Sequence, residues 1–573
     1  MADYTAPTGA IATTLLDVVQ ALPTLHQLPA HRDSDAELLR QVLDEAGRFV
    51  SGVVAPLNRS GDETGARWRD GQVTMPPGFR EAYQAFWQAG WPALSAHPDH
   101  GGQGLPVVLE MALYEMLSAA NHGWTMAPGL LHGAAECIAH HASDDLKAIY
   151  LPKLVSGEWL ATMCLTEPHA GSDLGLCATR ATPLPDGRYA LSGTKIFISG
   201  GDHDLTNNIV HLVLARLPEA PPGPKGLSLF LLPKFCEDGQ RSAVHCERIE
   251  EKMGLHGSPT CVLRFDAAAA WLVGEPGKGL NAMFVMMNAA RLHVAMQGIG
   301  LLDAAHQKAS AYAQERLQMR APQRPAERRE AADPIAWHPA VQRVLRTQGC
   351  WVALGRVIAY RTALELDVAR HHPDAARRQQ AERWCALCTP VLKSAWTDQA
   401  FHGASACLQV FGGHGYVREW GIEQHVRDAR VAMIYEGTNE IQAIDLLLRK
   451  TLPDGGAALT GLLDQLLHEL QTAGADARAR QAVAQVRDWL AELLPTLQAP
   501  AQAEAGPHWV AEEVLRATAL ALMAWANGLQ QQRQPGADTQ AFWRWVWPEM
   551  AQRRAVVAAM RDSQAMLANF AAA

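Results

Sequence analysis

The stretch Met163-Cys-Leu-Thr-Glu-Pro-His-Ala-Gly-Ser-Asp173 separates two regions of different secondary structure. Before it, from about residue 10 to 160, apolar residues recur three and four positions apart, which predicts amphipathic helices. After it, to about residue 275, β-prone runs such as Arg188-Tyr-Ala-Leu-Ser-Gly-Thr-Lys-Ile-Phe-Ile-Ser199 alternate with Gly, Pro and Asp turns. The pattern therefore predicts a compact β-domain inserted between helical regions.

Helical periodicity returns at Leu280 and continues to about residue 450. The polar, Pro-rich segment from Arg320 to Pro334 interrupts it and is interpreted as a mobile loop. We expect a mainly α fold with an inserted β-domain, of the barrel or sandwich type, and a four-helix bundle. The expected divisions are an N-terminal extension (1–35), an α-helical domain (36–160), the β-domain (161–278), a helical bundle (279–450) and a C-terminal helical extension (451–573).

The amino-acid composition excludes several classes of protein. Of the 573 residues, 48% are apolar and 19% charged, so each domain can bury a core. The net charge of -9 argues against a surface built for nucleic acid or anionic lipid. No apolar run approaches the roughly 20 residues of a membrane-spanning helix, and the first residues lack the layout of a secretory signal. We expect a cytoplasmic enzyme with no nucleic-acid partner and no membrane attachment.

The ten cysteines are scattered and are interpreted as reduced core residues. Cys385 and Cys388 have the spacing of a redox or half-zinc site, but no second pair or set of histidines accompanies them. A buried helical position is favoured for both, and no metal site is predicted. Dinucleotide-binding glycine motifs, phosphate loops, zincin motifs and nucleophile elbows are absent from the sequence, which lowers the rank of those enzyme classes.

Two segments carry candidate chemistry. Backbone amides and hydroxyls of the 163–173 stretch could bind a heteroaromatic ring and a phosphate, although composition alone favours an ordinary capped turn. In Ile434-Tyr-Glu-Gly-Thr-Asn-Glu-Ile-Gln442, Glu436 follows an apolar run, and desolvation could make this carboxylate a useful base. The alternative is a helix-start acid that complements the macrodipole, which the residues alone favour.

Seven segments in series resemble the acyl-CoA dehydrogenase superfamily of flavoproteins, through most of residues 36–450. They are Cys164-Leu-Thr-Glu-Pro-His-Ala-Gly-Ser-Asp173, Gly193-Thr-Lys-Ile-Phe-Ile-Ser-Gly-Gly201, Glu251-Lys-Met-Gly-Leu-His-Gly-Ser-Pro-Thr260, Asn288-Ala-Ala-Arg291, Tyr312-Ala-Gln-Glu-Arg316, Phe411-Gly-Gly-His-Gly-Tyr416 and Tyr435-Glu-Gly-Thr-Asn-Glu-Ile-Gln442. The Tyr4-Thr-Ala-Pro7 segment, the Ser199–Asp204 segment and the C-terminal extension resemble the long branch that includes 3-(methylthio)propionyl-CoA dehydrogenase.

The resemblance implies an FAD-dependent oxidoreductase that converts an acyl-CoA to its trans-2-enoyl-CoA, with a short, medium or thioether chain expected. FAD would lie between the β-domain and the helical bundle. Glu436 would remove the α-proton while the β-hydrogen leaves as hydride to the flavin. By the same analogy, the Glu436 backbone amide and a ribityl hydroxyl would stabilise charge on the thioester oxygen, one such donor being worth about 3–4 kcal/mol.

The resemblance also assigns binding residues. The implied FAD-binding residues are Leu165, Thr166, Gly171, Ser172, Phe197, Ser199, Arg316, Gln409, Gly412, Gly413, Thr438 and Glu440. The implied substrate-binding residues are Ser172, Asn288, Arg291, Tyr435 and Gly437. Four of the FAD-binding positions, Arg316, Gln409, Gly412 and Gly413, match those that reach FAD held mainly by a neighbouring subunit. A homodimer or dimer of dimers is therefore expected, with an electron-transferring flavoprotein as electron acceptor.

Departures from the family pattern are also visible. His169 replaces a common Gly, and Ala290 occupies a helix position where some relatives place their catalytic Glu. The long loop after Arg316 puts the subunit-shared FAD contacts that follow it in doubt.

Three other functions were weighed. An acyl-CoA oxidase shares these motifs, and the sequence does not separate it from a dehydrogenase. A DNA-protective flavoprotein is disfavoured because residues 451–573 hold nine Arg, no Lys and twelve Asp plus Glu. A catalytically silent scaffold is disfavoured by the presence of Glu436. The aromatic run Trp543-Arg-Trp-Val-Trp547 is expected to pack in a core rather than touch a membrane.

Overall fold

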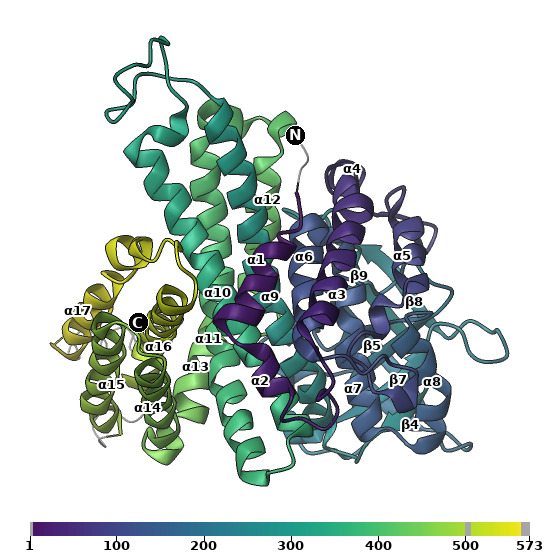
Figure 1. Ribbon diagram of the computed structural model, residues 1–573. Coiled ribbons are helices and arrows are strands. Elements are labelled where there is room, and N and C mark those ends of the chain that lie inside the picture. Colours follow the sequence, from purple (N-terminus) through teal and green to yellow (C-terminus); the bar gives the residue numbers. More distant parts are fainter. Residues whose placement is uncertain (1–3, 499–505, 563–573) are drawn as a thin grey trace. The chain divides into compact units, whose positions relative to one another are not determined.

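The computed structural model describes residues 4–498 and 506–562 (Figure 1). The chain forms two compact units: unit 1 comprises Met1–Ala6 and Asp44–His293, and unit 2 comprises Pro7–Leu43 and Val294–Ala573. The α-helices are α1 Thr8–Thr13, α2 Ala21–Leu25, α3 Ala36–Phe49, α4 Asn58–Thr64, α5 Phe79–Gln88, α6 Val107–Thr125, α7 Leu131–His141, α8 Asp144–Ser156, α9 Gly279–Glu315, α10 Pro339–His371, α11 Ala375–Val410, α12 Ile422–Ala429, α13 Asn439–Ile444, α14 Ala457–Thr472, α15 Ala477–Leu497, α16 Gly506–Arg533 and α17 Glu549–Asp562. The strands are β1 Arg67–Arg69, β2 Gln72–Thr74, β3 Leu160–Cys164, β4 Arg180–Pro183, β5 Tyr189–Ser199, β6 Ile209–Arg216, β7 Leu227–Pro233, β8 Val244–Ile249 and β9 Thr260–Val273.

The order of elements confirms the predicted fold class, helices followed by a β-domain and then further helices. The change to strands falls at β3, which ends one residue before Leu165. In the helical part of unit 1, α6 is buried along its whole length, which fits its near-continuous apolar sequence. Helix α8 begins where the Ser143 hydroxyl accepts a hydrogen bond from the Leu146 amide, and it ends at Gly157, whose φ is 84°.

A short hairpin of β1 and β2 lies within the helical region of unit 1 and was not predicted. Its turn is Asp70-Gly71, and both residues have positive φ, 52° and 78°. Asp-Gly is a preferred pair for such a two-residue turn. The signal was therefore present, but the strands of three residues each were too short for their alternation to be noticed.

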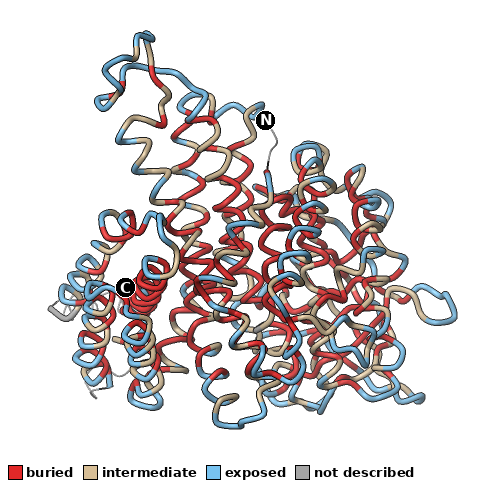
Figure 2. The backbone as a smooth tube through the Cα atoms, in the orientation of Figure 1, coloured by how far each residue is buried: buried red, intermediate tan, exposed pale blue. Residues whose placement is uncertain are grey.

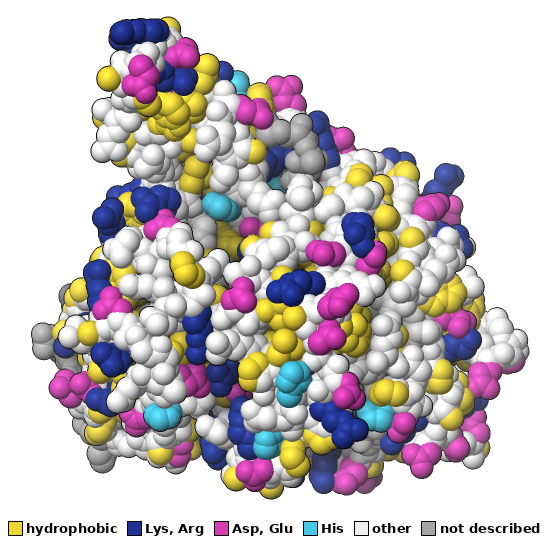
Figure 3. Space-filling model, in the orientation of Figure 1, with side chains coloured by type: hydrophobic (Ala, Val, Ile, Leu, Met, Phe, Trp, Pro, Cys, Tyr) yellow, Lys and Arg dark blue, Asp and Glu magenta, His cyan; other side chains and the backbone are white. Residues whose placement is uncertain are grey.

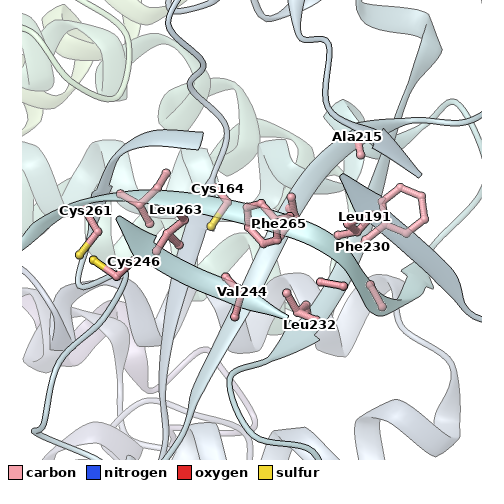
Figure 4. Close-up of a cluster of buried hydrophobic side chains, with 14 of the residues drawn as sticks. Cys164, Leu191, Ala215, Phe230, Leu232, Val244, Cys246, Cys261, Leu263 and Phe265 are labelled. Atoms are coloured by element: carbon pink, nitrogen blue, oxygen red, sulfur yellow. The ribbon is translucent and has the colours of Figure 1, made fainter. Parts of the chain in front are cut away.

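The β-domain closes on itself. Its strands follow the order β3-β6-β4-β5-β9-β7, and an additional pairing of β7 with β6 completes a ring from which β3 and β8 project. Strand β7 is buried at every position, which matches a sequence that is apolar except for Ser228. The core within the β-domain contains, among others, Cys164, Leu191, Phe230, Leu263 and Phe265 (Figure 4). The closed arrangement places the loop after β3 and the end of β5 on one rigid scaffold.

Unit 2 is built on three long helices, the Val294–Glu315 part of α9 together with α10 and α11. Small residues let them approach closely: a Cβ at Gly298 would lie 2.8 Å from the Trp396 carbonyl oxygen. On the other side, a Cβ at Gly355 would overlap the Trp396 indole ring. That indole nitrogen donates to the Trp351 carbonyl over 2.9 Å. The two glycines therefore fix how α11 packs on its neighbours.

The C-terminal helices pack within unit 2. Helix α16 is buried almost throughout (Figure 2), and the Trp525 indole nitrogen donates to Glu469 over 3.1 Å. In the aromatic run, Trp543 is 5% exposed and lies under the Arg478 guanidinium, 4.5 Å from the ring centroid. Trp545 and Trp547 are half-buried. These contacts confirm the prediction that the aromatic run packs in a core, and among the described residues no helix has both the length and the apolar character to cross a bilayer.

Cys385 and Cys388 both lie on α11, in agreement with the helical interpretation. The Cys385 thiol donates to the Thr362 carbonyl oxygen over 3.7 Å. Burial raises the pKa of both thiols because desolvation disfavours the thiolate. Neither cysteine is therefore available as a thiolate nucleophile.

The segment from Arg320 to Pro334 has an internal organisation of its own. Asp333 is fully buried, with the Arg328 Nε 2.7 Å and the Arg324 Nη1 3.5 Å from its carboxylate, and it accepts the Ala321 amide. Burial opposes the ionised form, but the hydrogen bond from Ala321 and the two arginines hold the pKa of Asp333 below its usual value. Its mobility stays a prediction.

The close packing around Trp396 gives a testable prediction. Gly355→Ala adds helix propensity, about 1 kcal/mol, but forces a methyl group into the indole ring, which costs about 1–3 kcal/mol and displaces a buried hydrogen bond. We expect a lower urea midpoint of unfolding. Gly461→Ala on α14 is the matched control, because nothing lies within 4 Å of the added Cβ, and it should raise the midpoint. Equal midpoints for the two variants would contradict this account of the packing.

Candidate active site

The loop after β3 is held by a buried ion pair. Lys195 on β5 is fully buried, and its ammonium lies 2.8 Å from a Glu167 carboxylate oxygen and donates to the Leu165 carbonyl oxygen over 2.8 Å. The Ile196 amide donates to the Thr166 carbonyl oxygen over 2.9 Å. The two implied flavin-binding residues of this loop, Leu165 and Thr166, are therefore fixed against β5.

Glu167 is satisfied from three directions. Besides Lys195, its carboxylate accepts the Ala178 amide over 2.7 Å, the Thr179 amide over 3.1 Å and the Thr179 hydroxyl over 2.6 Å. Burial disfavours the charge, but Lys195 and these hydrogen bonds outweigh it, so the pKa of Glu167 is lowered. Because the folded pKa lies below the unfolded value of 4.5, the stabilisation is complete above that pH and is lost as the pH falls toward the lower value.

Phe197 and Ser199 lie at an irregularity of β5. The register of β5 on β9 shifts between Lys195 and Ile198, and Phe197 within that bulge has a φ of 59°. Left-handed backbone at a bulky residue costs of order 1–3 kcal/mol and is concentrated at functional sites. The Phe197 ring is 59% exposed, and Ser199 beyond it is half-buried. The bulge thus directs an aromatic ring away from the β-domain core.

Gly171 and Ser172 are exposed, and nothing lies within 4 Å of a Cβ added at Gly171. His169 lies on the same loop, where its Nε2 is 3.1 Å from the Leu176 carbonyl oxygen and 3.6 Å from Glu167. The ring therefore braces the turn from within the chain. An open backbone at Gly171 suits the approach of a ligand phosphate.

On α9, Arg291 is 7% exposed, whereas the side chain of Asn288 lies outside the described residues. Two positions beyond Arg291, the Nε2 of His293 lies 3.3 Å from the Glu110 carboxylate. The Nδ1 of His132 lies 3.1 Å from the same group. Burial disfavours the Glu110 charge, but the two histidines outweigh it and hold the pKa well below its usual range. This buried cluster ties α6, α7 and α9 together, and no sequence pattern predicted it.

In unit 2, Glu436 lies in a strained loop before α13. Its φ is 56°, in the left-handed region, and the next residue, Gly437, has a φ of 82°. The Glu436 side chain is half-buried. Burial, and secondarily the Glu436 charge, raises the pKa of Tyr435, whose hydroxyl donates to Gln297. The Tyr435 phenol therefore stays neutral next to the Glu436 carboxylate.

Buried polar side chains on α11 and α13 hydrogen-bond to this loop. Lys393 on α11 is fully buried and donates to the Gly437 carbonyl oxygen over 2.8 Å and to the Asn439 side chain over 3.0 Å. Gln442, also fully buried, donates to the Glu436 carbonyl oxygen over 3.1 Å. These contacts compensate the strain at Glu436 and fix the direction of its backbone.

Thr438 and Glu440 begin α13. The Thr438 hydroxyl accepts the Ile441 amide over 3.3 Å, which is an N-cap contact. The hydrogen bond with Thr438 lowers the pKa of Glu440, which lies exposed in the first turn. The interpretation of Glu436 as a helix-start acid is therefore wrong, because Glu436 precedes the N-cap Thr438 and the acid in the first turn is Glu440.

Four further predicted positions gather elsewhere in unit 2. Tyr312 stacks on Phe411, with ring centroids 4.1 Å apart, and so brings the chain near Arg316 against the turn that holds Gly412 and Gly413. Gln409, Arg316 and both glycines are exposed, with nothing within 4 Å of a Cβ added at either glycine. Along α11 this end is 16 residues from Lys393, or about 24 Å. The structure does not bring this group to the Glu436 loop of the same chain.

Three models of the acyl-CoA dehydrogenase family match the chain: the N-terminal domain at residues 36–158, the middle domain at 162–268 and the C-terminal domain at 277–450. The chain is 41% identical over 507 residues to a 3-methylmercaptopropionyl-CoA dehydrogenase of Ruegeria pomeroyi, covering 87% of this chain and 85% of that protein. It is 35% identical over 452 residues to a butyryl-CoA dehydrogenase of Syntrophomonas wolfei, covering 75% and 73%.

A solved structure shares the fold. It is an acyl-CoA dehydrogenase from Bacillus anthracis complexed with FAD, with a TM-score of 0.72, 21% identity and coverage of 96% of this chain and 92% of that one. The chain therefore belongs to the acyl-CoA dehydrogenase family, and it is an oxidoreductase of that flavoprotein class.

Several residues that shape the site were not assigned by the sequence analysis. Glu167 and Lys195 stand inside two of the quoted motifs, so their presence was recorded, but only the fold brings their charges together. Lys393 gave a weaker signal, a lone charge in the apolar helical stretch Val391-Leu-Lys-Ser-Ala-Trp396. Gln442 also stands inside a quoted motif, but no role was assigned to it, and Gln297 lies outside all of them.

The buried ion pair generates a prediction. In Lys195→Met the Glu167 carboxylate stays buried without its ammonium partner, which costs about 3–5 kcal/mol in unfolding free energy. The loop at Leu165 and Thr166 loosens as well, so we expect FAD retention on gel filtration to fall at least tenfold. Lys153→Met, which removes the partly exposed ion pair with Glu158, is the control and should change stability by less than about 1 kcal/mol. Full flavin content in Lys195→Met would refute the role of this ammonium.

Proposed function

We propose that this chain catalyses the FAD-dependent α,β-dehydrogenation of a short-chain or thioether acyl-CoA, with Glu436 as the catalytic base. The observation that carries the proposal is the Glu436 loop itself. A carboxylate on strained, left-handed backbone is clamped by Lys393 and Gln442 and stands beside a neutral tyrosine. Such strain persists where surrounding contacts over-determine it, and catalytic positions are typical examples.

The features of the two units fit a bound FAD. In the β-domain, half-buried Thr166 and Ser199 offer hydroxyls, Phe197 offers an exposed ring, and Gly171 leaves its backbone open. We assign the flavin ring to Leu165, Thr166, Phe197 and Ser199, and the pyrophosphate to the turn at Gly171 and Ser172. In unit 2, Thr438 and Glu440 are assigned to the phosphates and the adenosine. When bound, FAD supplies the hydride acceptor for the β-carbon.

The residues of this chain would then divide the work. Glu436 takes the α-proton of the thioester on its carboxylate, and its backbone amide donates to the thioester oxygen as charge develops there. Ser172, Arg291, Tyr435, Gly437 and Asn288 are the proposed substrate contacts. Position 290, where some relatives place their base, holds a buried alanine, so no second carboxylate competes there.

The substrate class rests on the relatives. Two of them are named for a thioether acyl-CoA and for butyryl-CoA, both with short chains. The chain covers 85% and 73% of their lengths, so the comparison includes most of each enzyme. We therefore assign a chain of about this length to the present enzyme.

We also propose assembly in pairs, on the basis of a separation within unit 2. Gln409 lies about 24 Å along α11 from Lys393, which contacts the Glu436 loop. Gln409 and the neighbouring Arg316, Gly412 and Gly413 are therefore proposed to reach the FAD of a second copy. The same end of the unit exposes large apolar side chains at Met319, 77%, and Tyr416, 89%, which suits burial against another subunit. A homodimer or dimer of dimers is the proposed assembly.

Electron-transferring flavoprotein is the proposed electron acceptor.

A reducing, cytoplasmic location is also proposed, and it agrees with ten cysteines that are all free. The face in Figure 3 mixes basic and acidic side chains, without a broad basic patch of the kind that nucleic acid requires. We also propose that the domains meet at residues 160/161, 278/279 and 450/451.

The role of Glu436 predicts a specific phenotype. Glu436→Gln keeps the shape of the side chain and its backbone contacts but removes the base. FAD should therefore stay bound, while bleaching of the flavin by acyl-CoA slows by at least about 10³-fold. This factor lies in the upper half of the usual range for general base catalysis. Anaerobic stopped-flow absorbance of the flavin measures it. Glu382→Gln, an exposed carboxylate on α11, should bleach at the normal rate. Normal bleaching in Glu436→Gln would overturn the assignment.

The substrate class can be tested on the unaltered holoenzyme. We expect 3-methylthiopropionyl-CoA and butyryl-CoA to bleach the flavin with a kcat/KM at least tenfold above that of palmitoyl-CoA. The reason is that each buried methylene is worth about 0.8 kcal/mol only where the pocket has room for it. Equal values across the series would contradict the short-chain assignment and leave the base assignment standing.

A further inference from the structure

Two histidines and an aspartate meet in unit 2, far in sequence from every motif described above. His31 lies in the turn that follows α2, and Asp367 and His371 lie in the last turns of α10. Helix α2 packs on α10. Three potential metal-ligand atoms, one from each side chain, all lie within 4.8 Å of one another.

The turn that carries His31 is rigid. The His31 amide donates to the Leu28 carbonyl oxygen over 2.9 Å, and the Ser34 amide donates to the His31 carbonyl oxygen over 3.0 Å. The His26 Nε2 lies 2.8 Å from the Ser34 carbonyl oxygen. This hydrogen bonding fixes the backbone at His31, so the direction of its imidazole is determined by the fold.

The distance between His31 and Asp367 does not fit a direct hydrogen bond. The His31 Nε2 lies 3.6 Å from the Asp367 Oδ1, beyond the usual 2.7–3.2 Å. Their side chains are only 4% and 1% exposed. In the part of the chain that the structure describes, the His31 Nε2 has no hydrogen-bond partner, although it is fully enclosed. A buried imidazole nitrogen 3.6 Å from a carboxylate oxygen and without a hydrogen bond is unusual, because buried polar atoms are almost always paired.

The spacing suits a cation between them. Ligand atoms about 2.0–2.2 Å from a tetrahedral zinc ion lie roughly 3.4 Å apart, close to the separation found here. Asp367 and His371 are four residues apart, which places both on one face of the helix. The His31 and His371 rings meet edge to face with centroids 5.3 Å apart. The three ligand atoms lie within 4.8 Å of one another, so zinc binding requires a side-chain adjustment of at most about 1.4 Å, and half-buried His371 at the end of its helix leaves access for water.

We propose that His31, Asp367 and His371 bind a zinc ion, with water as the fourth ligand. Two neutral imidazoles and one carboxylate are ligands that zinc prefers, whereas magnesium and calcium favour sets made of oxygen alone. The ion would cross-link the turn after α2 to the end of α10 and so anchor the segment Pro7–Leu43 on the bundle of unit 2. The sequence analysis predicted no metal site because 336 residues separate His31 from Asp367.

The test uses the full-length, FAD-loaded protein after dialysis against a chelator. Titration with zinc chloride in a calorimeter is expected to give one ion per chain with a micromolar or tighter Kd, and cobalt(II) should produce the visible absorption of a low-symmetry site. Zinc should also raise the Tm. His31→Gln and His371→Gln should each weaken binding at least 30-fold; His371 is partly exposed at a helix end, so that variant retains the fold.

The chain supplies a matched control. Asp398 and His402 on α11 have the same spacing of four residues, 3.5 Å apart and more exposed, but they belong to no three-residue ligand group among the described residues. His402→Gln should leave zinc binding unchanged. Zinc that binds His31→Gln and His371→Gln as tightly as the unaltered protein is adventitious, and absence of stoichiometric binding leaves a plain histidine–aspartate pair. Either result overturns the proposal, and flavin bleaching, measured separately, is unaffected by it.

Discussion

Two completely buried lysines determine where the motif loops lie. Removing an ammonium group from water is affordable only when fixed oxygens surround it, so each lysine dictates the conformation of the chain that supplies them. In unit 1, Lys195 takes the Leu165 carbonyl and the Glu167 carboxylate. In unit 2, Lys393 takes the Gly437 carbonyl and the Asn439 side chain. In both units a buried ammonium therefore fixes a motif loop, the one at Leu165–Glu167 and the one at Glu436.

Backbone strain accompanies both clamps. Phe197 and Glu436 have positive φ angles, 59° and 56°, although neither is glycine. Each costs of order 1–3 kcal/mol. Phe197 lies two residues from Lys195 itself, and Glu436 carries the carbonyl oxygen that Gln442 binds. At Phe197 the result is an exposed ring on a β-bulge. At Glu436 it is a carboxylate that stands before α13 instead of capping it, and Glu440 is the acid in the first turn of the helix.

Much of the fold was readable in advance because periodicity is a local property. The change from period 3.6 to β-prone runs around Met163 placed the β-domain. The aromatic run at Trp543 was correctly assigned to a core. The Asp70-Gly71 hairpin was missed because strands of three residues are too short for a periodic signal. The Glu110 cluster with His132 and His293 was missed because its members come from three separate helices.

Side-chain type and spacing along the chain were enough to predict the main succession of helical and β regions, the family and the motif residues. Only the tertiary structure decided which charges meet. Lys195 is 28 residues from Glu167, Lys393 is 44 from Gly437, and His31 is 336 from Asp367, so no local rule links them. Burial determines how strong these interactions are, because charges and polar groups interact strongly only where water is excluded. Exclusion of water is a property of the packed fold.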